Sequence, residues 1–148
     1  MRGREMSNEA AHVFAVRVYY EDTDAAGIVY YANYLKYAER ARTEMMRALG
    51  VENSRIRNEK GILFVVRDCA MDFRHPARLD DQLEVHTRLT DVGGASFSGE
   101  QRVKRNGEDL VTIQIRLACM TATGQPARMP KDLRAQLNEL LNKNNGSN

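Results

Sequence analysis

The chain has 148 residues, 43% of them hydrophobic, and its 22 basic and 20 acidic residues leave a formal net charge of +2. This length fits one domain with a sizeable core, and the interspersed charges lack the one-sided basic run that nucleic-acid binding requires. No apolar run approaches the roughly 20 residues that span a membrane, and the polar stretch MRGREMSNEAAH has no signal-peptide core, so we expect a cytoplasmic protein without a transmembrane segment.

The first predicted element is a strand over residues 13–20, VFAVRVYY, where apolar and polar side chains alternate and β-branched and aromatic residues are frequent. From Asn33 onward the apolar residues recur every three or four positions, which predicts a helix of about 17 residues. Asn33 is its predicted N-cap and Gly50 its predicted C′ residue, since asparagine accepts a first-turn N–H bond and glycine tolerates a left-handed backbone. Three alanines are expected to allow close packing of this helix on a sheet: Ala38, Ala41 and Ala48.

Four further strands are predicted, over residues 62–73, 81–92, 95–105 and 108–120. In the first of them, apolar residues occupy most odd positions up to Phe73, which predicts that one face of this strand is buried. Asn106-Gly107 is a strong signal for a type I′ hairpin, so the last two strands are expected to pair antiparallel.

The C-terminal region reads as a short helix that opens at Pro130 and carries Leu133, Leu137 and Leu140 on one side. The polar tail over 142–148, NKNNGSN, is expected to be disordered.

This order of elements favours an α+β fold in which a curved antiparallel sheet wraps around one long helix, rather than an alternating parallel fold. Such a sheet leaves strand edges that must be covered, charged or paired. Sheet-to-sheet association would pair an edge, so we expect a homodimer, or a homotetramer built from dimers.

Two segments carry a family resemblance: VRVYYEDTDAAGIVYYANYLKYAERARTEMMRALG over 16–50 and HPARLDDQLEVHTRL over 75–89. They resemble the hotdog-fold acyl-CoA thioesterases of the 4-hydroxybenzoyl-CoA thioesterase superfamily, most of all the bacterial YbgC-like subfamily associated with the Tol-Pal system. The resemblance implies a hotdog domain over 13–130, followed by a short helix and tail over 131–148. It also implies active sites between subunits, hydrolysis of acyl-CoA to a free acid and CoA, and no metal or organic cofactor.

By this resemblance the catalytic aspartate is Asp24, the first residue of the D-x-x-G-I-V pattern, whereas Asp22 lies outside it. A thioester carbonyl is electrophilic, and a carboxylate can attack it as a nucleophile or can take a proton from water as a general base. The sequence leaves both roles open. The competing interpretation is that Asp24 only accepts loop amides in an Asx-turn.

The helix start supplies a second expected component, because its free N–H groups and the positive end of the helix dipole favour a negative oxygen. The resemblance assigns the polarising N–H to the main chain of Tyr31. The YbgC-like subfamily commonly has histidine there, so an imidazole contribution is absent from this chain. Gly27 is expected to let the loop turn closely beneath the substrate, or to serve simple turn chemistry.

Substrate-binding candidates are drawn from aromatic and cationic residues. Tyr30, Tyr34 and Tyr37 are candidates for the acyl pocket, although core packing is the favoured interpretation for all three because aromatic residues at helical spacing usually lie in the core. The phosphates of CoA require cations, which makes Arg88 and Lys104 candidates, with Arg102 and Arg105 nearby on the same strands. The alternative for all four is an ordinary solvated charged face.

Other chemistries find little support in the sequence. No motif joins His12, His75 or His86 to a serine or cysteine as a catalytic triad. Cys69 and Cys119 stand in no metal-binding spacing and are interpreted as buried thiols, and no metal site is predicted.

Two functions therefore remain. The favoured one is an acyl-CoA thioester hydrolase with Asp24 as nucleophile or general base and the helix start polarising the carbonyl, for which an acyl carrier protein is a possible alternative substrate carrier. The other is an acyl-carrier or envelope-complex binding protein that retains the fold with weak hydrolysis.

Overall fold

Five antiparallel strands form one sheet in the order β1-β3-β4-β5-β2, in a computed structural model that describes residues 11–146. The strands are β1 (His12–Arg17), β2 (Ile62–Phe73), β3 (Gln82–Val92), β4 (Ser96–Arg105) and β5 (Glu108–Thr121). All five were predicted, although β1 ends earlier than expected and a short 3₁₀ turn, η1 (Tyr20–Asp22), follows it.

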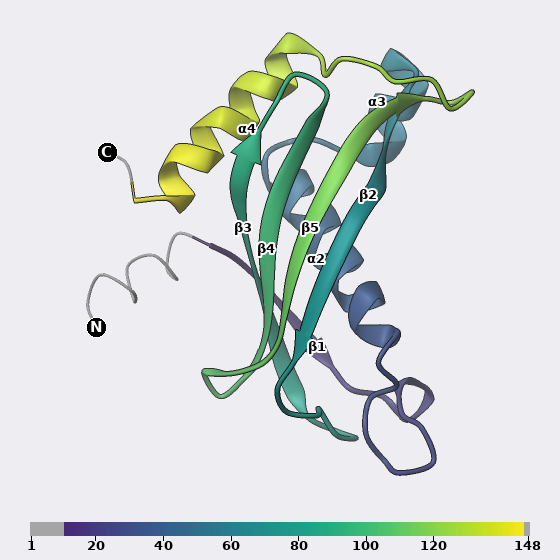
Figure 1. The fold of residues 1–148 in the computed structure, drawn as a ribbon, viewed down its shortest axis with the longest axis vertical. Helices are drawn as coiled ribbons and strands as arrows, with labels where there is room; N and C mark the ends of the chain where they lie inside the picture. Colours follow the sequence, from purple (N-terminus) through teal and green to yellow (C-terminus); the bar gives the residue numbers. More distant parts are fainter. Residues whose placement is uncertain (1–10, 147–148) are drawn as a thin grey trace.

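Helix α2 (Asn33–Ala48) lies against the concave face of this sheet, which curves around it (Figure 1). Its buried side chains recur at helical spacing: Tyr34, Tyr37, Ala38, Ala41, Met45 and Met46. They meet the inward-facing residues of β3, β4 and β5, among them Leu83, Val85, Val103 and Ile113. The predicted α+β arrangement of a curved antiparallel sheet around one long helix is therefore confirmed.

Of the two predicted ends of α2, the C-terminal one agrees with the structure and the N-terminal one does not. Gly50 has φ +82°, and the N–H groups of Gly50 and Val51 donate to the carbonyls of Arg47 and Met46, both at 2.9 Å, so the predicted glycine C′ position is confirmed. The Asn33 N-cap prediction is wrong, because Ala32 occupies the N-cap and the Asn33 side-chain amide donates to the Asp22 carbonyl at 2.8 Å.

Of the three helix alanines, Ala38 and Ala41 are fully buried against the sheet as expected. Ala48 is exposed, contrary to the prediction, because the last turn of α2 extends beyond the sheet-facing stripe. At the β4–β5 connection, Asn106 and Gly107 have φ values of +52° and +82°, which confirms the type I′ hairpin.

Strand β2 departs from its predicted half-burial. Its residues 66–70 are exposed on both faces, Cys69 included, and Phe73 is 50% exposed. The reason is position, since β2 is the last strand of the sheet and α2 packs mainly over β1 and β3. Within residues 11–146, no strand pairs with the outer edge of β2.

Helix α4 (Lys131–Asn144) packs against β3. Of the three leucines predicted on one side, Leu133 and Leu137 are buried and Leu140 is partly buried, but the helix continues into the tail that was expected to be disordered. The buried Asn144 explains the difference, because its Oδ1 accepts the Leu89 N–H at 2.7 Å and so ties the end of α4 to the sheet. Residues 147 and 148 lie outside the described residues.

Helix α3 (Asn53–Lys60) was not predicted from the sequence. It has no buried residue and follows α2 closely, above the N-terminal end of β2 (Figure 1). None of the helices in the described part of the chain is long and apolar enough to cross a membrane.

Candidate active site

The loop that carries Asp24 is a tight hairpin beside the start of α2. Thr23 and Val29 form an antiparallel bridge, and the Asp24 N–H donates to the Ile28 carbonyl at 2.9 Å. Gly27 closes the turn with φ +79°, a conformation that favours glycine. Its N–H donates to the Asp24 carbonyl at 3.0 Å, so the backbone fixes the position of Asp24 without using its side chain.

The Asp24 carboxylate is held by one oxygen. Oδ1 accepts the Ala26 N–H at 2.8 Å, which is an Asx-turn. The other oxygen receives no hydrogen bond from any residue that the structure describes, and the side chain is exposed. The turn geometry that competed with a catalytic role is therefore present, but it orients the carboxylate and leaves one oxygen available.

A second turn, residues 75–81, supports this hairpin from the other side. Val29 donates its N–H to the Ala77 carbonyl at 2.9 Å, and the Ala77 N–H donates to the Tyr34 hydroxyl at 3.0 Å. Arg105 holds the turn through Asp81 at 2.7 Å. Ala77 thus couples the Asp24 hairpin to α2, a contact that no sequence pattern indicated.

Asp22 has a different environment from Asp24. Its Oδ2 accepts the Tyr19 N–H at 2.8 Å, and its carbonyl accepts the Tyr30 N–H at 3.0 Å. Burial, and then the neighbouring Asp22, raise the pKa of the Tyr37 hydroxyl. Asp22 therefore braces the loop against α2.

The backbone at the start of α2 offers free donors. Tyr30 and Asn33 donate their N–H groups to Asp22 and Tyr30, whereas the Tyr31 N–H has no acceptor among residues 11–146. Tyr31 stands immediately before the N-cap Ala32, where the dipole of α2 is positive. The structure thus places an unpaired N–H where the sequence predicted one.

Aromatic rings surround this helix start. The rings of Tyr30 and Tyr31 lie 5.0 Å apart between centroids, and Phe73 lies 6.3 Å from Tyr31. Tyr34 and Tyr37 are buried in the core as predicted, whereas Tyr30, Tyr31 and Phe73 are largely exposed. Core packing is therefore wrong for Tyr30, which lies before the first turn of α2 and outside its buried face. The position of Phe73 beside Tyr31 was not predicted, because its place at the end of a strand indicated only core packing.

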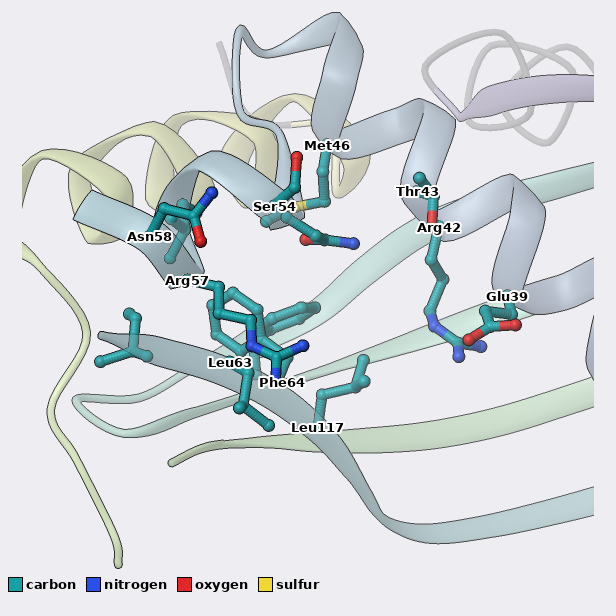
Figure 2. Close-up of a pocket in the computed structure, with 14 residues that line it drawn as sticks. Glu39, Arg42, Thr43, Met46, Ser54, Arg57, Asn58, Leu63, Phe64 and Leu117 are labelled. Atoms are coloured by element: carbon teal, nitrogen blue, oxygen red, sulfur yellow. The ribbon is translucent and has the colours of Figure 1, made fainter. Parts of the chain in front are cut away.

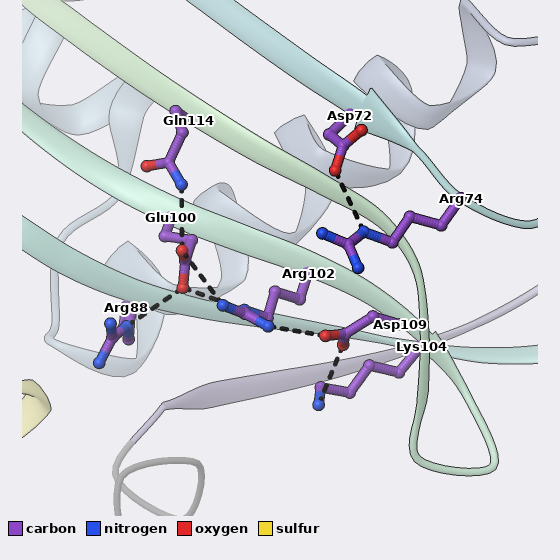
Figure 3. A network of polar contacts seen from close by, with 8 residues as sticks. All are labelled: Asp72, Arg74, Arg88, Glu100, Arg102, Lys104, Asp109 and Gln114. Atoms are coloured by element: carbon purple, nitrogen blue, oxygen red, sulfur yellow. Dashed lines mark hydrogen bonds and ion pairs between the residues drawn. The ribbon is translucent and has the colours of Figure 1, made fainter. Parts of the chain in front are cut away.

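The cations that were predicted to bind phosphate form ion pairs with carboxylates of the protein (Figure 3). Arg88 pairs with Glu100 at 3.3 Å, and Lys104 pairs with Asp109 at 3.1 Å. Arg102 joins the two carboxylates. Burial alone would raise the pKa values of Glu100 and Asp109, but their bonds to these cations outweigh it and lower both. The network lies on the sheet face opposite α2, as Glu100 and Arg102 alternate with the helix-facing Gln101.

A cavity of about 490 Å³ opens between α2, α3 and the sheet (Figure 2). Its apolar wall consists of Met46, Ile56, Ile62, Leu63, Phe64, Phe97 and Leu117. Its polar residues include Glu39, Arg42 and Arg57. The eleven-residue separation of Tyr31 and Arg42 corresponds to about 17 Å along the helix. The cavity was not predicted from the sequence because α3, which lines one side of it, lacks apolar residues at helical spacing.

Metal ligands are not gathered in the part of the chain that the structure describes: no group of three or more histidine, cysteine, aspartate or glutamate side chains could hold an ion there.

Comparison with known proteins gives consistent matches over most of the chain. A family model described as the thioesterase-like superfamily matches residues 18–137. The acyl-CoA thioesterase YbgC of Haemophilus influenzae is 42% identical over 128 residues, which are 86% of this chain and 94% of that protein. The acyl-CoA thioester hydrolase YbgC of Escherichia coli O157:H7 is 38% identical over 126 residues, covering 84% and 93%. The crystal structure of a probable thioesterase from Bartonella henselae superposes with a TM-score of 0.79 at 37% identity, covering 81% of this chain and 99% of that one.

Proposed function

The chain belongs to the thioesterase-like superfamily, and from that premise we propose that it hydrolyses acyl-CoA thioesters to a free carboxylic acid and CoA. The observation that carries the proposal is the segment from Asp24 to Tyr31. There, an oriented carboxylate with one free oxygen precedes an unpaired backbone N–H at a helix start. These are the two groups that thioester hydrolysis requires, a nucleophile or base and a donor for the oxyanion.

Two reaction paths are open to Asp24. As a nucleophile, its free oxygen attacks the thioester carbon, the C–S bond breaks, CoA leaves as a thiolate that takes a proton from solvent, and water hydrolyses the resulting mixed anhydride. As a general base, it removes a proton from water, the hydroxide oxygen attacks, and the proton returns to the departing CoA thiolate. In both paths the Tyr31 N–H donates to the carbonyl oxygen as negative charge develops on it.

The remaining candidates have defined parts in the proposal. Gly27 gives the hairpin the tight turn that presents Asp24, and Tyr30 offers an exposed ring beside the reacting group. For Arg88 and Lys104 to bind the phosphates of CoA, they would have to exchange Glu100 and Asp109 for them. Their role in binding stays a prediction.

We place the subunit contact at β2. Antiparallel pairing of this strand with its copy about a twofold axis at Asp68 would set Phe73 of one subunit opposite Leu63 of the other. The cavity that begins at Ile62 would then face the Asp24 loop of the partner. Each site would thus combine the hairpin of one chain with the cavity of the other, and an exposed strand edge would be covered.

Light scattering tests this contact and separates masses of two and four chains. Val66→Lys puts a charge on the outer half of β2, where Val66 is 50% exposed, and should weaken association and lower activity together. Val13→Lys is the matched control on the opposite sheet edge, where Val13 is 45% exposed. Full activity of a strictly monomeric protein at low concentration would exclude a shared site.

Hydrolysis itself is tested with the purified protein and a panel of acyl-CoA thioesters, with a thiol-reactive reporter to follow CoA release. The same acyl groups on acyl carrier protein show which carrier is preferred. Turnover of any of these thioesters well above the uncatalysed rate supports the proposal. Tight binding without turnover across the panel would favour the alternative, a binding protein of the same fold.

A further inference from the structure

Arg42 brings a positive charge into the space between α2 and the sheet and is only weakly engaged there. Its Nη1 donates to Oε1 of Gln101 at 3.0 Å. A guanidinium has five N–H donors, and no carboxylate among the described residues forms an ion pair with it. Burial lowers the pKa of Arg42, although Glu39 acts in the opposite direction. Arg42 is thus a half-buried cation with most of its donors unused by the protein.

The direction of this guanidinium is fixed from the core. Gln101 is fully buried, and its Nε2 donates to the Ala38 carbonyl at 2.9 Å and to the Thr87 hydroxyl at 3.0 Å. The amide can therefore turn only its oxygen toward Arg42, which holds one edge of the guanidinium and leaves the others toward the cavity. A buried polar group without hydrogen-bond partners is costly. The hydrogen bonds from Thr87 through Gln101 to Arg42 therefore favour one orientation of the guanidinium.

The cavity that Arg42 faces is apolar with a charged rim. Arg57 extends from α3 into the same space, and Glu39 lies beside Arg42 on α2 (Figure 2). The rim thus carries two cations and one anion, a net positive charge above a wall of aliphatic and aromatic side chains. A ligand that fits both features has an apolar chain and a terminal negative charge.

Helix α2 leads from the start of the helix, beside the proposed reacting group, to the cavity. Leu35 and Arg42 lie seven residues apart on one face of α2, and Leu35 is 42% exposed. Arg42 also interacts electrostatically with Cys69, near the middle of β2. In a dimer paired through β2, Arg42 would lie near the twofold axis, at similar distances from the Asp24 loops of the two subunits.

We propose that Arg42 selects acyl groups that end in a carboxylate, so that the substrates include monothioesters of long-chain dicarboxylic acids. The inference rests on the proposed thioesterase function and names its substrate class. The length follows from the helix: an extended dodecanedioyl chain has eleven C–C bonds, about 13 Å at ~1.2 Å per bond. With a hydrogen bond of ~3 Å to the guanidinium, it spans the ~17 Å from the helix start to Arg42.

The kinetic test compares dodecanedioyl-CoA with dodecanoyl-CoA. The wild-type protein should show a kcat/KM at least about 10-fold higher for the dicarboxylic substrate, as expected for one charge-assisted hydrogen bond. In Arg42→Gln this ratio should fall to near one, and Arg42→Lys, which keeps the charge but loses the planar fork, should be intermediate. Arg40→Gln, on the exposed face of the same helix, is the matched control and should retain the wild-type ratio.

A binding measurement keeps the inference separate from the proposed hydrolysis. The monomethyl ester of dodecanedioic acid should bind at least about 10-fold more tightly than the dimethyl ester by calorimetry, and Arg42→Gln should abolish the difference. If no thioester is hydrolysed but this Arg42-dependent difference is found, the carboxylate site stands and the proposed function falls. Equal binding of the two esters by wild-type protein, or a preference that survives in Arg42→Gln, would overturn the inference.

Discussion

Replacing Asp24 with asparagine separates the structural role of this residue from its chemical one. The Asx-turn needs only an acceptor at Oδ1, where the Ala26 N–H now donates at 2.8 Å, and asparagine supplies one. The Asp24 N–H bond to Ile28 and the Thr23–Val29 bridge belong to the backbone and are unaffected. The substitution therefore removes the negative charge from the free oxygen and leaves the hairpin in place.

The two expected effects differ widely in size. On stability, an exposed charge-assisted hydrogen bond becomes a neutral one, a loss of about 1 kcal/mol or less, which corresponds to a fall in Tm of roughly 2–4 °C for a chain of this length. On catalysis, loss of a general base costs about 10²–10⁴-fold, and loss of a nucleophile can cost more. Under the proposed mechanism the loss should appear in kcat, since the carboxylate would act on the reacting atoms rather than on the acyl chain.

Steady-state hydrolysis followed by CoA release, with thermal unfolding of the same samples, measures both effects. Asp22→Asn is the control, because it lies in the same loop and asparagine can still accept the Tyr19 N–H; it should lose much less activity. The reasoning fails if Asp24→Asn stays within a few-fold of wild type while Asp22→Asn loses activity.

Three further outcomes follow from the described contacts. Tyr31→His should retain activity, while a folded Tyr31→Pro variant should lose it because proline removes the N–H. Unchanged hydrolysis by a folded Tyr31→Pro variant would exclude the backbone donor. The pKa of Glu100 is lowered in the folded protein from its ordinary value of 4.5, so its contribution to stability is present above pH 4.5 and is lost as pH falls through the folded-state pKa. Glu100→Gln should therefore flatten the decline of the unfolding free energy below pH 4.5 in urea titrations, and an unchanged slope would contradict this. Asn144→Ala should cost about 1–3 kcal/mol by leaving the Leu89 N–H buried without its partner, which calorimetric unfolding would detect as a lower Tm; an unaltered Tm would remove the proposed tie.

Features set by neighbouring residues were predictable from the sequence. The type I′ hairpin at Asn106-Gly107 and the end of α2 at Gly50 depend on local backbone preference. The helix itself followed from its apolar period, and the catalytic assignment of Asp24 followed from the family resemblance. That assignment stays a prediction, although the structure shows a hairpin that orients its carboxylate.

Features set by distant partners were not predictable. Asn33 has the right chemistry for an N-cap, but the Asp22 carbonyl, eleven residues earlier, takes its side chain. Arg88 and Lys104 looked like free cations because the strand register that brings Glu100 and Asp109 beside them is set by tertiary pairing. The exposure of Cys69 likewise depends on β2 being an edge strand, which alternation along one strand does not specify.

Helix α3 gives the cavity beneath it a particular character. It has eight residues, buries none of them fully, and begins only a few residues after the sharp end of α2 at Gly50. A helix with so little buried apolar surface has a small free energy of local opening, and its amides are expected to exchange with solvent far faster than those of β4 or β5. We therefore expect local opening of α3 to widen the space above Phe64 and Leu117 without repacking of the sheet.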